Sequence, residues 1–191
     1  MAHATGTTVG NGAGTGPLAL THVTVIDGSG AAPAPDMTVV AEGGRITALT
    51  PSARARLRPG TRTVDLTGKF LIPGLIEAHT HSDGPQTVVP VAGLTPAEAL
   101  RAATRDAART LALPGVGTVA RGQAADLLVL DADPLRDIRN TRRIHGVVVD
   151  GRWITPEERR RLPTAVEKAA AQTPPPEEGA TMTGCGCGGH P

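Results

Sequence analysis

Short apolar runs, separated by turns rich in glycine or proline, recur along most of this chain and predict β-strands. Two pairs of runs flank Gly43-Gly44 and Asp150-Gly151, and we expect each pair to form a hairpin because glycine accepts the positive φ of a tight turn. The expected strands are residues 18–26, 37–41, 45–49, 63–66, 69–72, 75–81, 126–131, 144–149 and 152–154.

A helix is predicted after residue 94. Thr95 is the expected N-cap, Pro96 occupies the first helical position and Glu98 completes a capping box. Apolar residues follow at helical spacing as far as Leu111, and Pro114-Gly115 ends the pattern. A second helix is expected over residues 155–172, where a capping signal precedes a proline that should kink it.

The apolar content restricts what the core can contain. The chain has 191 residues and is 39% hydrophobic, but Phe70 and Trp153 are its only aromatic residues. The core must therefore be built from alanine, valine, leucine and isoleucine, without the large buried area that aromatic rings supply. Both chain ends are poor in apolar residues, and we expect residues 1–17 and 173–191 to be disordered.

Charge and cysteine content argue against several classes of function. With 19 basic and 18 acidic residues, the net charge of +1 gives no reason to expect binding to nucleic acid or to a membrane. The two cysteines, Cys185 and Cys187, stand close together near the end, which excludes a disulfide framework and favours a cytoplasmic protein. We find neither a secretory signal nor an apolar run near the roughly 20 residues of a membrane span.

The strongest chemical signal is the pair His79 and His81, at the end of an apolar strand that follows Pro73-Gly74. Alternate side chains of a strand share one face, so the two imidazoles should lie roughly 6.7 Å apart along it. From that separation both rings can reach one divalent ion at about 2.0–2.1 Å. Two other segments could bind a ligand. Cys185, Cys187 and His190 could hold a soft metal, and the arginine run 159–161 could bind nucleic acid. We interpret both segments as solvated.

The segment 71–81, LIPGLIEAHTH, strongly resembles the first barrel strand of the amidohydrolase superfamily, with Glu77 in place of the usual aspartate. Residues 23–68 resemble the small β-sandwich of these proteins, and residues 94–104 are similar to their last barrel helix. Residues 117–151 resemble the return of the chain into the sandwich. The nearest relatives look like imidazolonepropionase-like and Xaa-Pro dipeptidase-like members.

This resemblance implies a metal-dependent hydrolase that acts on C–N bonds of small-molecule amides, either cyclic amides or dipeptides. It implies Zn²⁺ or another divalent ion as the cofactor, with His79 and His81 as ligands of one metal. The family draws its remaining ligands and its general base from later barrel strands. No residue of this chain matches that base, since nothing assigns the role to Asp83, and we therefore name no catalytic residue.

The barrel itself is largely missing from this sequence. A (β/α)8 barrel takes about 250 residues, whereas only residues 82–93 separate the histidine strand from the last barrel helix. We expect a mainly β fold with flanking helices, a composite β-sandwich with one remnant barrel strand and the last barrel helix, and no complete (β/α)8 barrel. The expected parts are a tail (1–17), half of the sandwich (18–70), the barrel remnant (71–113), the other half (114–154), a helix (155–172) and a second tail (173–191).

Catalytic zinc needs about three protein ligands, so we expect this chain neither to hold metal stably nor to be active by itself. The alternative is a non-catalytic sandwich remnant or interaction module, which would associate with itself through its stranded apolar segment or with a partner chain. A separate chain could supply the missing strands. A deletion introduced during sequencing or assembly would give the same sequence.

Overall fold

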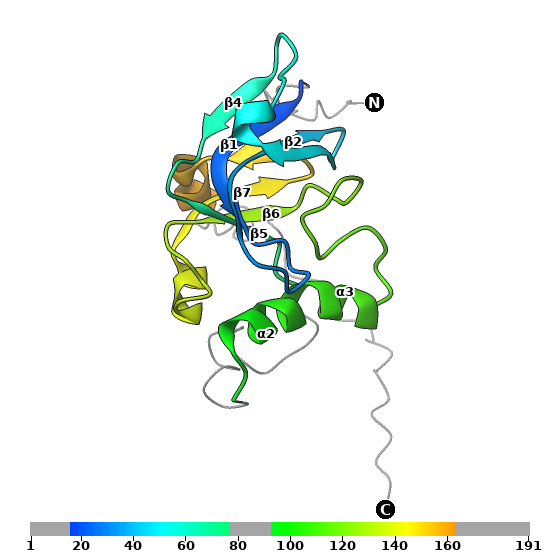
Figure 1. Ribbon diagram of the computed structural model, residues 1–191, viewed down its shortest axis with the longest axis vertical. Coiled ribbons are helices and arrows are strands. Elements are labelled where there is room, and N and C mark those ends of the chain that lie inside the picture. The colour runs from blue at the N-terminus through cyan, green and yellow to red at the C-terminus, as the bar shows by residue number, and fades with distance from the viewer. Residues whose placement is uncertain (1–15, 77–92, 163–191) are drawn as a thin grey trace, which may run out of the picture. The chain divides into compact units, whose positions relative to one another are not determined.

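The computed structural model describes residues 16–76 and 93–162 of the chain. Eight strands form a sheet in the order β3-β2-β1-β5-β6-β7-β8, with β4 beside the first part of β1 (Figure 1). The strands are β1 (Leu18–Val25), β2 (Ala34–Glu42), β3 (Arg45–Pro51), β4 (Arg62–Asp65), β5 (Phe70–Pro73), β6 (Leu127–Leu130), β7 (Ile144–Val149) and β8 (Arg152–Ile154).

The central strand β1 has two different neighbours on one edge. Its first residues pair in parallel with β4, and its last residues, Thr24 and Val25, pair in parallel with β5. Between the two pairings His22 adopts a positive φ of 57°, a conformation that side-chain-bearing residues rarely adopt. The other edge of β1 pairs antiparallel with β2, with irregular register on both sides of Val23. Because of this interruption, β1 pairs first with β4 and then with β5.

The two halves of the sequence meet where β5 pairs antiparallel with β6, with Phe70 opposite Leu130 and Pro73 opposite Leu127. The two predicted hairpin turns also meet, because the amide of Ala125 donates to Gly44 and its carbonyl accepts from Gly151. The sheet therefore curls until its distant hairpins touch. The expected composite of an amino-terminal and a carboxyl-terminal half is confirmed.

Two apolar clusters fill the molecule. The main cluster lies inside the curled sheet and contains residues from both halves, among them Leu20, Leu71 and Val129, with Trp153 at its margin. The second cluster joins the sheet to the helical segments, since it contains Ile72 and Leu130 of the sheet and Leu100 of the helix. As expected, the fully buried large side chains are leucine, isoleucine and valine.

The predicted helix after Thr95 is present and lies next to the end of β5 (Figure 1). It consists of α2 (Pro96–Arg101), a π-helical turn η2 (Ala102–Asp106) and α3 (Ala107–Thr110). The predicted capping box is confirmed: the Thr95 side chain accepts from the Glu98 amide, and the Glu98 side chain accepts from the Thr95 amide. Two short 3₁₀ turns complete the secondary structure, η1 (Ser52–Arg54) and η3 (Ile138–Arg142).

One predicted element is wrong in the part that is described. We expected a strand to begin at Leu75, but Leu75 and Ile76 are not in a strand. The amide of Gly74 still bonds to the Asp126 carbonyl, whereas the amide of Ile76 donates to the Ala103 carbonyl of the helix. The helix therefore replaces the sheet as the partner of the chain just after Pro73-Gly74.

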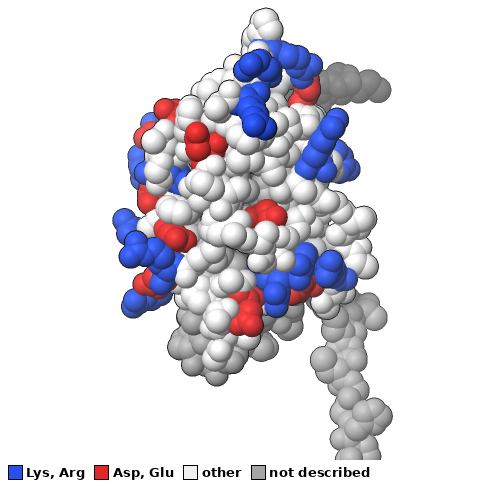
Figure 2. All heavy atoms as spheres, in the orientation of Figure 1, with Lys and Arg blue, Asp and Glu red and all other residues white. Residues whose placement is uncertain are grey.

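The chain divides into two compact units, residues 1–156 and residues 157–191. In the second unit, residues 157–162 are helical and an ion pair joins Arg160 to Glu157. Across the described residues, no helix has both the length and the apolar character that crossing a bilayer requires. On the face of the molecule in Figure 2, acidic and basic side chains are interspersed.

Candidate functional site

The predicted metal ligands His79 and His81 lie outside the described residues, as does Glu77. The structure does describe the chain up to Ile76 and from Gly93 onward, which includes the elements that lead into and out of the histidine segment.

Strand β5 and the glycine after it set the path toward the histidines. The amide of Gly74 donates to the carbonyl of Asp126 at 2.8 Å. A Cβ at Gly74 would lie 3.1 Å from that same carbonyl oxygen, so the Asp126 backbone would have to shift by a few tenths of an ångström to admit a larger residue. Close packing against the Asp126 backbone therefore explains the glycine of the Pro73-Gly74 pair.

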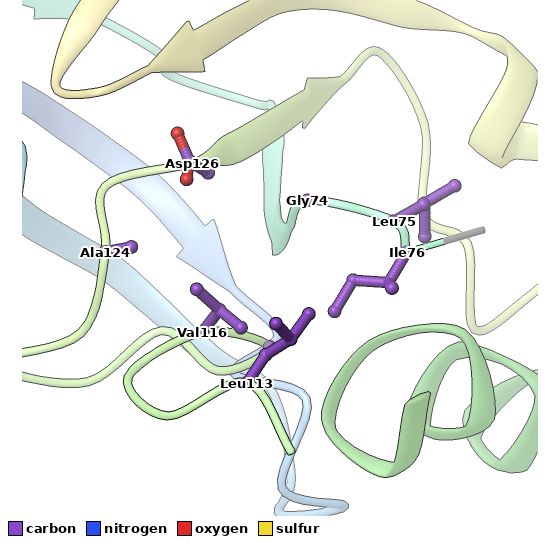
Figure 3. Close-up of a pocket in the computed structure, with 8 residues that line it drawn as sticks. Gly74, Leu75, Ile76, Leu113, Val116, Ala124 and Asp126 are labelled. Carbon is purple, nitrogen blue, oxygen red and sulfur yellow. The ribbon is translucent and has the colours of Figure 1, made fainter. Parts of the chain in front are cut away.

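A hollow of about 220 Å³ opens where the chain leaves the sheet, lined mainly by Leu75, Ile76, Leu113, Val116 and Asp126. In Figure 3 the side chains of Ile76, Leu113 and Val116 border the same space, and Asp126 lies on its opposite side. A second hollow of about 380 Å³ shares Leu75 and Asp126 and extends along β6 and β7.

These hollows are apolar with a single acidic group. The Oδ1 of Asp126 accepts the amide of Asp150 at 2.8 Å, so this carboxylate closes a turn. Hydrolysis needs a nucleophile or a metal-bound water together with a proton carrier. The described lining offers a carboxylate already engaged in a turn, and by itself it is not a hydrolytic centre.

The described histidines do not combine into a metal site. His22 Nδ1 lies 2.8 Å from Asp36, and His145 Nδ1 lies 3.1 Å from Asp131, so each ring has a carboxylate partner of its own. Within residues 16–76 and 93–162, no group of three or more histidine, cysteine, aspartate or glutamate side chains could hold a metal. The described residues therefore do not fit the metal that the resemblance implies, and we derive no catalytic step through it.

One polar cluster was missed by the sequence analysis. Asp131 Oδ1 accepts from Lys69 Nζ at 2.8 Å and lies 3.1 Å from His145 Nδ1, which joins residues around β5, β6 and β7. The hydrogen bond from Lys69 is the largest influence on the pKa of Asp131, which is lowered although burial opposes the shift. Once β5 and β6 are paired with Phe70 opposite Leu130, their flanking residues Lys69 and Asp131 become neighbours. The pairing register is the signal that could have revealed the cluster.

The cluster has the composition of a structural ion pair. It contains a cation, a carboxylate and an imidazole, and its three side chains are between 29% and 36% exposed. None of the three is an activated hydroxyl or thiol. We interpret it as a link between the two halves of the sheet.

Known proteins agree with this architecture. A family model described as "Amidohydrolase family" matches residues 85–154. An N-acyl-D-aspartate deacylase of Alcaligenes xylosoxydans xylosoxydans is 46% identical over 61 residues, which is 32% of this chain and 11% of that protein. An adenine deaminase of Paracoccus denitrificans is 40% identical over 47 residues, which is 25% of this chain and 8% of that protein. The chain thus spans about a tenth of the length of these relatives.

The fold is also similar to that of solved structures. A Xaa-Pro dipeptidase with bound methionine superposes with a TM-score of 0.60 at 8% identity, over 73% of this chain and 100% of that chain. At this identity the likeness concerns the fold alone. The chain is therefore similar in sequence to the amidohydrolase family over residues 85–154, and its likeness in fold to the dipeptidase extends over 73% of the chain.

Proposed function

We propose that this chain provides the sandwich and the first metal-binding segment of a metal-dependent hydrolase of C–N bonds, and that it is inactive by itself. The observation that carries the proposal is the pairing of β5 with β6, which joins both halves of the sandwich into one sheet. Only residues 74–95 stand between β5 and α2. A (β/α)8 barrel takes about 250 residues, so the catalytic strands of the family have no room there.

The number of available donors supports the same proposal. His79 and His81 would contribute two imidazoles to one divalent ion. Catalytic zinc is held by three protein ligands and keeps a further position for water. The described residues contribute no further cluster of donors, so a third ligand would have to come from outside them. Two ligands without supporting contacts hold an ion weakly and leave its water poorly oriented.

Activity measurements test this proposal directly. The purified chain, supplied with Zn²⁺, should hydrolyse neither cyclic amides nor Xaa-Pro dipeptides faster than a His79→Ala/His81→Ala variant does. The double variant is the matched control because it removes the proposed ligands and leaves the sandwich unchanged. Zinc-dependent turnover by the parent chain that disappears in the double variant would overturn the proposed inactivity.

A second function is favoured by the apolar surface around the two hollows. Leu75, Leu113 and Val149 border these mainly apolar hollows, and their exposed fractions are 37%, 45% and 51%. Neighbouring apolar side chains at a surface favour association. We propose that the chain forms a non-catalytic module that associates with a second copy of itself through this surface.

Light scattering after size exclusion tests the association. The parent chain should elute as a dimer or a larger species, and Leu75→Ser or Val149→Ser should shift it toward the monomer. Leu57 is a suitable control, because it is 39% exposed and lines neither hollow, so Leu57→Ser should behave like the parent. A parent chain that is monomeric at high concentration would contradict this proposal.

A further inference from the structure

The helix that begins at Pro96 departs from regular α-helical bonding next to the point where the chain leaves the sheet. In a regular helix the amide of Ala107 would donate to the carbonyl of Ala103, four residues earlier. Here it donates to the carbonyls of Ala102 and Thr104 instead. The carbonyl of Ala103 is thereby available, and it accepts the amide of Ile76 at 2.9 Å.

A buried threonine lies in the same turn. Thr104 is fully buried, and its hydroxyl donates to the carbonyl of Leu100 at 2.7 Å. A threonine hydroxyl that bonds to the carbonyl four residues earlier competes with the backbone amide for that acceptor and bends the helix. Thr104 is therefore in the right place to maintain the π turn.

Two glycines let the surrounding backbone approach this turn closely. A Cβ at Gly117 would lie 2.9 Å from the carbonyl oxygen of Thr104. A Cβ at Gly28 would lie 3.2 Å from the Thr104 hydroxyl and 3.0 Å from Pro73 at the end of β5. The turn is thus held between two loops and the last residue of the strand that leads to the histidines.

Two amides fix the direction in which the chain leaves this junction. The amide of Gly74 bonds to Asp126 of the sheet, and the amide of Ile76 bonds to Ala103 of the helix. One fixed point would allow the chain to pivot, whereas two points on different elements define its direction. His79 lies three residues beyond the second point.

We propose that the π turn is an anchoring device: the carbonyl of Ala103 anchors the amide of Ile76, and Thr104 maintains the turn, so that the chain just after β5 is held against the helix. π turns frequently occur where a helix serves a function, and here the released carbonyl has an identified partner.

Hydrogen exchange at the Ile76 amide tests the anchor. Thr104→Val keeps the shape of the side chain but removes its hydroxyl, so Ile76 should exchange about tenfold faster, as expected for the loss of one hydrogen bond. Thr104→Ser keeps the hydroxyl and should retain the slow exchange. The amide of Gly74 is an internal control, because it bonds to the sheet and should be unaffected in both variants. Equal exchange of Ile76 in the valine and serine variants would overturn the role of Thr104.

A second variant covers the case in which Thr104→Val does not fold. Ile76→Pro removes the donated hydrogen and leaves the helix sequence unchanged. Because one hydrogen bond is lost, this variant should lower the free energy of unfolding by about 1 kcal/mol, measured by urea denaturation. An unchanged free energy of unfolding would overturn the anchor.

Discussion

The ammonium group of Lys69 lies 2.8 Å from the Oδ1 of Asp131, and this pair ties the start of β5 to the end of β6. The two residues are 62 positions apart in the chain, and they come from the two halves that the sheet unites. His145 Nδ1 lies 3.1 Å from the same oxygen, which adds β7 to the link. One carboxylate therefore connects three neighbouring strands at the edge of the second apolar cluster.

This link should make stability depend on pH. The pKa of Asp131 is lowered in the folded state, chiefly by the hydrogen bond from Lys69, so the ionised carboxylate stabilises the fold above the unfolded pKa. That contribution is lost as the pH falls from the ordinary value of 3.8 through the lower folded value. Asp131→Asn should reduce the free energy of unfolding at neutral pH by less than about 1 kcal/mol, because the pair is partly exposed. Urea denaturation at several pH values measures the difference, which should vanish in acid.

Variants of Lys69 are the controls for that experiment. Lys69→Met should resemble Asp131→Asn at neutral pH, and Lys69→Arg should keep most of the stabilisation because its charge remains. The double variant Lys69→Met/Asp131→Asn should lower the free energy of unfolding by less than the sum of the two single variants, since both changes remove the same interaction. Strict additivity would show that the pair contributes nothing to stability.

The close approach of Gly117 to the helix gives a second prediction. Gly117 and Gly122 have nearly equal positive φ angles, 85° and 86°, so alanine at either position suffers the same backbone strain. A Cβ at Gly117 would also lie 2.9 Å from both Thr104 and Ala108, whereas a Cβ at Gly122 would meet nothing within 4 Å. Gly117→Ala should therefore destabilise the fold by about 1–3 kcal/mol more than Gly122→Ala, the usual cost of overpacking. Equal urea midpoints would mean that the helix can move away at no cost.

The single tryptophan offers a spectroscopic test of packing. Gly146 of β7 lies beneath the Trp153 ring, and a Cβ there would be 2.1 Å from the nearest ring carbon. Gly146→Ala must displace the indole, so the tryptophan fluorescence should shift to longer wavelength. The free energy of unfolding should fall by about 1–3 kcal/mol. Gly16→Ala is a suitable control, because a Cβ there would be 3.4 Å from its nearest neighbour. An unchanged emission spectrum in Gly146→Ala would contradict this packing.

Periodicity and turn residues were sufficient to predict most of the sheet. The apolar run in 18–26 and the Gly43-Gly44 turn are local signals, and they correspond to β1 and to the β2–β3 hairpin. The pairing of β5 with β6 is not local, and it was not predicted, because the resemblance assigned residues 71–81 to the first barrel strand and not to the sandwich. The link between Lys69 and Asp131 depends on the register of that pairing, which no local pattern specifies.

The error at Leu75 has a physical cause. Residues 75–81 have an apolar run that also suits a strand, but the amide of Ile76 is taken by the helix carbonyl of Ala103. That carbonyl is available only because of the π turn, which leaves no clear trace in a sequence of good helix formers. The metal ligands His79 and His81 lie beyond this point, outside the described residues, so their role remains a prediction.

The capping box at Thr95 gives the last prediction. Thr95 Oγ1 accepts the amide of Glu98 at 3.3 Å, and the Glu98 carboxylate accepts both the amide and the hydroxyl of Thr95. The hydrogen bond from the hydroxyl is the largest cause of the lowered pKa of Glu98. Thr95→Ala should destabilise the protein by about 1 kcal/mol at neutral pH, whereas Thr95→Ser should be nearly neutral because it keeps the hydroxyl.

The pH dependence distinguishes the two halves of the box. Because the pKa of Glu98 is lowered on folding, its stabilising contribution exists above the ordinary value of 4.5 and is lost as the pH falls through the folded value. The difference between the parent and Thr95→Ala should therefore shrink in acid, leaving only the bond from the Glu98 amide to Thr95. Exchange of the Ala99 amide, which donates to the Thr95 carbonyl at 3.0 Å, reports this locally. A constant difference across the whole pH range would show that the carboxylate does not contribute to the cap.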